Sequence, residues 1–210
     1  MIRLEIQYSK EQEKRGILAF LQSISWLKSQ GYKYTLPAGF EDEISKLKND
    51  EVLIAQTLDM YLSKEYDSAF YKDVEQFALS EWTRLFTRVN KLFSELSGII
   101  SPDTIKVTLT RYGPGGRYQP PDTIIVNIAL RKKSNVIETI IHEMIHLSME
   151  HLIQQNHIGH WEKERIVDLV MIKGFPEMAR LQCDPKNAAE IKKIFDNYYP
   201  HIDKIISKIS

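Results

Sequence analysis

Two histidines and a glutamate within five residues are the most chemically informative feature of this 210-residue sequence. His142, Glu143 and His146 form an HExxH pattern inside an apolar run. Residues four apart on an α-helix lie on the same face, so the two imidazoles can bind one metal ion. Glu143 is turned away from that face, from where it can hold a water beside the metal. The pattern therefore predicts a pair of metal ligands and a base on one helix.

A hydrolytic zinc site needs three protein ligands and an open position for water, so a third ligand must come from another segment. Glu164 lies eighteen residues after the second histidine, and Asp168 follows it by one helical turn on the same face. If Glu164 binds the metal, Asp168 can accept a hydrogen bond from the second ring nitrogen of a ligand histidine. His160 is the main alternative third ligand, followed by His157 and Glu162.

This arrangement resembles the gluzincin metalloproteases, the thermolysin-like clan, over roughly residues 104–173. In that clan the two motif histidines and a downstream glutamate bind zinc, and the glutamate after the first histidine is the general base. The residues that match these positions are His142, His146, Glu164 and Glu143. The resemblance implies a zincin-like fold and peptide hydrolysis. It also implies that the strand predicted at 122–130 is the edge along which an extended substrate aligns.

Other families that contain HExxH match this sequence less well. Metzincins require a histidine six residues after the second motif histidine, and that position is Leu152 here. Peptide deformylases take a cysteine ligand from upstream of the motif, whereas Cys183 lies downstream. SprT-like proteases take a third histidine from a following loop, and His157 and His160 leave that possibility open.

The predicted reaction is hydrolysis of a peptide bond by a zinc-activated water, with Glu143 as the general base. The oxyanion that develops needs a donor besides the metal. We predict Tyr118 and His201 for this role, because the loop 111–121 and the C-terminal segment could both be carried over a cleft. Further candidates are Tyr112, Arg117, Tyr198 and Tyr199.

Two stretches have the alternation of half-buried strands, 104–110 and 122–130, and a shorter alternation lies at 2–8. The segment between the two longer strands, RYGPGGRYQPP, is too long for a tight hairpin and is rich in Gly and Pro. We therefore expect an antiparallel pair with a projecting loop.

Apolar stripes at helical spacing cover most of the remaining sequence. Helices are predicted within 10–98, from Asn135 to about His151, at 161–173 and within 184–209. Asn135 and Glu138 are placed to form a capping box at the start of the motif helix. The predicted fold is α+β: mainly helical and zincin-like, with a small antiparallel sheet beside the HExxH helix. A helical lobe at 1–100 and a catalytic lobe at 101–210 would form one compact unit.

Composition limits the environment and the partners of the protein. Lys and Arg together number 28, as do Asp and Glu, so net charge gives no reason to expect a nucleic-acid or membrane-surface binder. The sequence shows no signal-peptide pattern and no apolar run of membrane-spanning length. The single cysteine, Cys183, fits a reducing compartment. We expect a cytoplasmic protein that acts on a peptide or protein substrate.

Two other functions are compatible with the same residues. An SprT-like protease would use His160 as the third zinc ligand. A non-catalytic interaction module would use the metal only to join two helices. A chance HExxH match in a chain of this size is on the order of one in a hundred, which favours a metal site over a coincidence.

Overall fold

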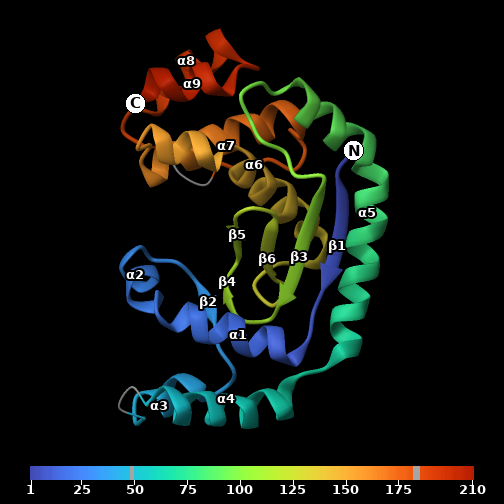
Figure 1. Cartoon of the computed structure of the whole chain (residues 1–210), viewed down its shortest axis with the longest axis vertical. Helices are drawn as coiled ribbons and strands as arrows, with labels where there is room; N and C mark the ends of the chain where they lie inside the picture. The colour runs from blue at the N-terminus through green and yellow to red at the C-terminus, as the bar shows by residue number, and fades with distance from the viewer. Residues whose placement is uncertain (48–49, 182–184) are drawn as a thin grey trace.

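A computed structural model of the chain describes residues 1–47, 50–181 and 185–210, so Cys183 lies outside the described residues. A four-stranded sheet stands at the centre, with helices around it (Figure 1). In spatial order its strands are β1 (Arg3–Gln7), β3 (Thr104–Thr110), β6 (Thr123–Asn127) and β5 (Gly116–Gln119). A second, two-stranded sheet pairs β2 (Tyr34–Thr35) with β4 (Gly113–Pro114).

The two predicted longer strands pair in parallel, so the prediction of an antiparallel pair was wrong. The chain leaves β3, passes through β4, returns as β5 and then turns back as β6, which lies between β3 and β5. Strand β6 is consequently parallel to β3 and antiparallel to β5. The segment predicted to be a projecting loop therefore contains β5, one of the two edge strands of the sheet. The predicted edge, 122–130, is instead paired on both sides.

Helices cover the sheet and supply most of the core. The first hundred residues form α1 (Lys10–Leu21), α2 (Ile24–Ser29), α3 (Phe40–Ile44), α4 (Glu51–Glu65) and α5 (Ser68–Glu95). The rest of the chain forms a short 3₁₀ turn (Lys133–Asn135), α6 (Val136–Gln155), α7 (His160–Gly174), α8 (Ala188–Tyr198) and α9 (Ile202–Ile209). Helix α6 packs against β5 and β6, and α7 packs along α6. The mainly helical α and β composition and the helical segments are as predicted.

The predicted capping box does not form at the motif helix. Asn135 does immediately precede α6, but its side chain makes no capping hydrogen bond. The 3₁₀ turn leads directly into the helix, and the Asn135 backbone there is already helical, so the side chain is not presented to the first turn. Burial of α6 among apolar side chains, rather than its cap, therefore holds the motif helix in place.

The main core draws on both halves of the chain. Ile2, just before β1, and Val74 and Leu85 of α5 belong to the same cluster as Ile124 and Ile141. A second, smaller cluster joins α1, α3 and α4. Its buried members are Ile17, Phe40, Ile54, Leu58, Leu62 and Tyr112. The predicted boundary at residue 100 thus lies within the main core, while residues 10–65 form a second cluster together with Tyr112.

A buried carboxylate connects the small cluster to the sheet. Glu13 of α1 is 1 % exposed and accepts hydrogen bonds from the hydroxyls of Tyr71 and Thr110 and from the backbone N–H of Arg111. Burial raises the pKa of Glu13, whereas these three donors act to lower it. One side chain therefore joins α1, α5 and the end of β3.

We predict that Glu13→Ala lowers the free energy of unfolding by about 3 kcal/mol, because three donors lose their acceptor at a buried position. Urea denaturation followed by circular dichroism measures this change. Glu11→Ala on the exposed face of the same helix is the matched control, with an expected effect within about 0.5 kcal/mol. Equal effects of the two variants would contradict a linking role for Glu13.

Candidate metal centre

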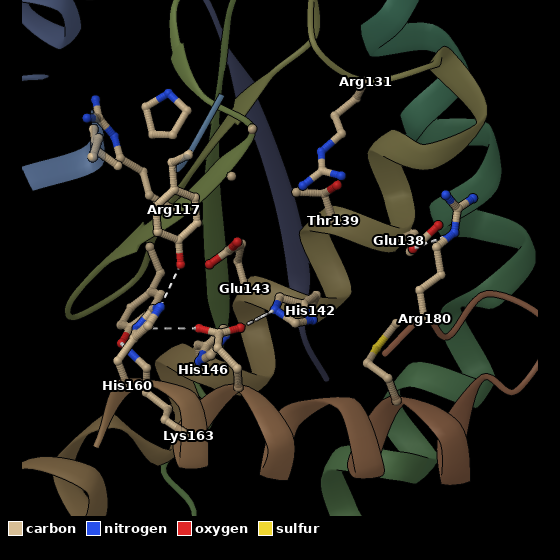
Figure 2. Close-up of a pocket in the computed structure, with 18 of the residues that line it drawn as sticks. Arg117, Arg131, Glu138, Thr139, His142, Glu143, His146, His160, Lys163 and Arg180 are labelled. Carbon is tan, nitrogen blue, oxygen red and sulfur yellow. Dashed lines mark hydrogen bonds and ion pairs between the residues drawn. The ribbon is translucent and has the colours of Figure 1, made fainter. Parts of the chain in front are cut away.

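Three side chains from two neighbouring helices meet at the base of a cleft. His142 and His146 project from the same face of α6, and Glu164 projects from α7. All three are buried, with exposures of 8 %, 2 % and 7 %. Figure 2 shows His142 and His146 below Glu143, with His160 to one side of them. Within the described ranges, this is the group of histidine and carboxylate side chains that could hold a metal ion.

The ligand atoms form a small triangle. The Nε2 atoms of His142 and His146 are 3.0 Å apart. Oε2 of Glu164 lies 3.2 Å from Nε2 of His146 and 3.4 Å from Nε2 of His142. Zinc–ligand distances of about 2.0–2.1 Å place the ligand atoms of a tetrahedral site about 3.3 Å apart. The triangle therefore has the dimensions of three corners of a zinc tetrahedron.

The pKa shifts of His146 and Glu164 also suit the binding of a cation. Burial lowers the pKa of His146 to about 4, so its imidazole is neutral near pH 7, as a metal ligand must be. Burial alone would raise the pKa of Glu164, but hydrogen bonds with His142 and His146 hold it below the ordinary value. Glu164 therefore stays ionised and supplies a negative charge to the group.

Glu143 lies beside this triangle and under the edge strand. Burial raises its pKa to about 7, a value suited to a group that takes up and releases protons. A Cβ atom at Gly116 of β5 would lie 2.6 Å from Oε1 of Glu143 and 2.7 Å from Cγ2 of Thr139. Glycine at this position therefore allows the edge strand to pass directly over the carboxylate.

The cleft has a volume of about 550 Å³ and two walls of different origin. Strand β5, α6 and α7 form the metal-ligand side. Trp26, Leu27 and Tyr32, from and after α2, form the opposite side. Sequence reasoning missed this second wall, because Trp26 and Leu27 resemble ordinary core residues and only the packing of α1–α4 brings them to the cleft.

His160 lines the cleft but does not complete the triangle. Its Nε2 is 2.6 Å from the hydroxyl of Tyr32, and its Nδ1 is 3.9 Å from Oε1 of Glu164. His157 sits in the turn between the two helices with a φ of 54°, and Glu162 accepts a hydrogen bond from Asn187. Glu164 is thus the third member of the group, and the three alternatives are not.

Tyr118 reaches the metal-ligand group, though not with its hydroxyl. Its ring stacks on that of His146, with centroids 5.3 Å apart and planes 9° apart. Its hydroxyl donates to Glu150 at 2.5 Å and accepts from Lys163 at 2.9 Å. In the part of the chain that the structure describes, Nδ1 of His146 has no hydrogen-bond partner. The stacked ring of Tyr118 therefore fixes the orientation that a hydrogen bond would otherwise fix.

Asp168 and His201 have contrasting positions. Burial lowers the pKa of His142, but the hydrogen bond with Glu164 and the surrounding carboxylates raise it. The charge of Asp168, which is 1 % exposed, contributes to this rise. His201 precedes α9, and its Nδ1 is 2.8 Å from the hydroxyl of Ser97. His201 is not among the residues that line the cleft, because the packing of α9 on α6 and α8 directs it to Ser97 instead. The structure therefore does not bring His201 to the cleft.

Comparison of the chain with known protein families, with curated proteins and with solved structures finds no match. Among the helices of the described ranges, none combines the length and the apolar content needed to cross a bilayer.

We predict that Tyr118→Leu weakens zinc binding by about tenfold, because the aromatic face that orients His146 is lost. Tyr118→Phe keeps the ring and is the matched control, with an expected change within about twofold. Competition with a chromophoric chelator measures both affinities. If the leucine variant binds zinc as tightly as the wild type, the stack does not orient the ligand.

Proposed function

We propose that this chain is a zinc-dependent peptidase with a zincin-like fold of the gluzincin type. The observation that carries the proposal is the triangle of His142, His146 and Glu164, with the Glu143 carboxylate beside it in an open cleft. Two imidazoles and one carboxylate are one of the ligand sets of hydrolytic zinc sites, which keep a fourth position for water. Zinc bound there would lower the pKa of a water towards 7 and polarise a substrate carbonyl.

Residues of the chain would transfer the proton and position the metal ligands. Glu143 would take a proton from the attacking water and deliver it to the leaving amine, for which a pKa near neutrality is suitable. Asp168 would support the imidazole of His142, and Tyr118 would position that of His146. Because its hydroxyl is engaged by Glu150 and Lys163, we assign Tyr118 this positioning role in place of oxyanion stabilisation.

Strand β5 offers the substrate a backbone template. It is one of the two outer strands of the sheet, and Gly116 brings it directly over Glu143. An extended peptide that pairs with an open sheet edge gains main-chain hydrogen bonds without a specific side-chain sequence. A peptide on β5 would therefore lie with its backbone above the metal-ligand group, which favours peptide bonds as the substrate.

A second candidate function is a metal site that only stabilises the packing of two helices. The observation in its favour is that the ligands come from both α6 and α7, so a bound ion would join them. In that case removal of the metal would lower the melting temperature greatly, and no peptide would be hydrolysed.

The ligand assignment predicts how zinc content responds to mutation. Glu164→Ala should reduce bound zinc from one equivalent to below about a tenth, because only two ligands remain. His160→Ala is the matched control and should keep a full equivalent. Metal analysis of the purified variants by inductively coupled plasma mass spectrometry measures this. The reverse pattern, loss in His160→Ala only, would favour the SprT-like alternative.

The catalytic assignment predicts a separate effect at Glu143. Glu143→Gln should keep its zinc but lose at least about a hundredfold in the rate of peptide hydrolysis, because the general base is gone. Mass spectrometry of a mixed peptide library before and after incubation measures the rate, with Glu11→Gln as an exposed control. Unchanged hydrolysis in Glu143→Gln would rule out the mechanism, and no hydrolysis by the wild type would favour the helix-joining role.

A further inference from the structure

The open part of the sheet edge is short and closed at one end. Strand β4, which immediately precedes β5, is already paired with β2. A peptide that adds to the sheet at the cleft can therefore pair with Gly116–Gln119. It cannot continue along β4, because β2 already occupies that part of the edge. In Figure 1, β2 and β4 lie below β5, next to α1. The stretch of open sheet edge along β5, called the lane below, thus ends within a few residues of Gly116.

A positively charged side chain lies at this closed end. The Nε and Nη2 atoms of Arg131 are each 2.9 Å from the position that a Cβ on Gly115 would occupy. Gly115 is the residue between β4 and β5. Figure 2 shows the Arg131 guanidinium above Thr139, extending towards the cleft on the side of Glu143 away from His160. Arg131 therefore marks the point at which the free edge stops.

The backbone that carries Arg131 is held by a buried amide. The Oδ1 atom of Asn127 accepts hydrogen bonds from the N–H groups of Ala129 and Leu130 at 2.9 and 3.2 Å. Its Nδ2 atom donates to Thr35 of β2 and to the Gly113 carbonyl of β4, at 2.7 and 2.6 Å. Asn127 is 0 % exposed. One residue therefore fixes both the closed end of the lane and the loop that leads to Arg131.

Arg131 forms no ion pair within the described ranges, although its charge acts to lower the pKa of Glu143 in the same cleft. Arg180 lies 3.7 Å from Glu138 at the same side of the cleft, and Lys163 contacts the Tyr118 hydroxyl on the other side. Bound zinc would add two further positive charges close by. The end of the lane is therefore a place where an anion would be attracted and an ammonium group repelled.

The direction of the strand decides which end of a peptide meets Arg131. Strand β5 runs from Gly116, next to Arg131, to Gln119. A peptide that pairs with it in antiparallel orientation has its carboxyl-terminal side at Gly116. A peptide in parallel orientation would bring its amino-terminal side there, towards a like charge. The positive charge therefore favours the antiparallel orientation.

We propose that Arg131 binds a substrate carboxylate one or two residues to the carboxyl-terminal side of the bond that is cleaved, so that the enzyme acts near the C-termini of peptides. This inference rests on the proposed peptidase function and adds its substrate class. The carboxylate can belong to the C-terminus itself or to an acidic side chain next to it. Both sources present the same planar anion, which a guanidinium can bind with two hydrogen bonds.

Binding to the zinc-loaded Glu143→Gln protein tests this without requiring turnover. The probes are mixed-sequence pentapeptides in three forms: with a free C-terminal carboxylate, with a C-terminal amide, and with an amide after a terminal aspartate. Equilibrium dialysis with mass spectrometry measures the retention of each form. We expect either carboxylate form to bind at least about tenfold more tightly than the plain amide, and the better form identifies the source.

Substitution of Arg131 should abolish this preference in the same protein. Arg131→Gln is expected to bind all three forms within about twofold, Arg131→Lys to keep part of the preference, and Arg15→Gln, an exposed arginine of α1, to keep all of it. The proposal is overturned if the three forms bind equally, or if Arg131→Gln keeps the preference. Hydrolysis by the wild type without such a preference would leave the peptidase function intact, and a preference without hydrolysis would leave the anion site intact.

Discussion

The structure depends on the pairing of α6 with α7, which brings three lone-pair-bearing atoms within 3.0–3.4 Å of one another in a buried position. Such groups repel one another in a low dielectric unless a proton or a cation lies between them. Apolar side chains on α6, among them Ile141, Met144 and Ile145, are at most 1 % exposed and keep the helix from turning to relieve the crowding. The surrounding core therefore maintains a geometry that a metal ion satisfies.

The sheet makes its own contribution, because it determines what lies above the metal-ligand group. Strand β6 lies between β3 and β5, so β5 is the outer strand on the side of the sheet that passes over α6. Gly116 then allows contact between that strand and Glu143. Glu143, the group of His142, His146 and Glu164, and the free backbone edge are consequently held by one packed unit of strand and helix, whereas the facing wall comes from the first part of the chain.

Local patterns allowed much of this site to be predicted from the sequence. The helical spacing of His142 and His146 and the spacing of Glu164 and Asp168 are properties of single helices, and the alternation of 104–110 is a property of a single strand. The edge strand was missed because Gly-Arg-Tyr-Gln has no alternation of apolar and polar residues. The antiparallel prediction, His201 and the wall of Trp26 and Tyr32 depended on contacts between distant segments, which periodicity does not report.

The presence of two hydrophobic clusters has a consequence for the behaviour of the cleft. The wall that carries Trp26 and Tyr32 belongs to the segment with the smaller cluster, while the ligand helices belong to the larger one. The two walls touch where Tyr32 meets His160. Segments with separate cores can open with separate free energies, well below that of global unfolding. If the two segments open separately, the facing wall would loosen or change in sequence while the group of His142, His146 and Glu164 keeps its shape.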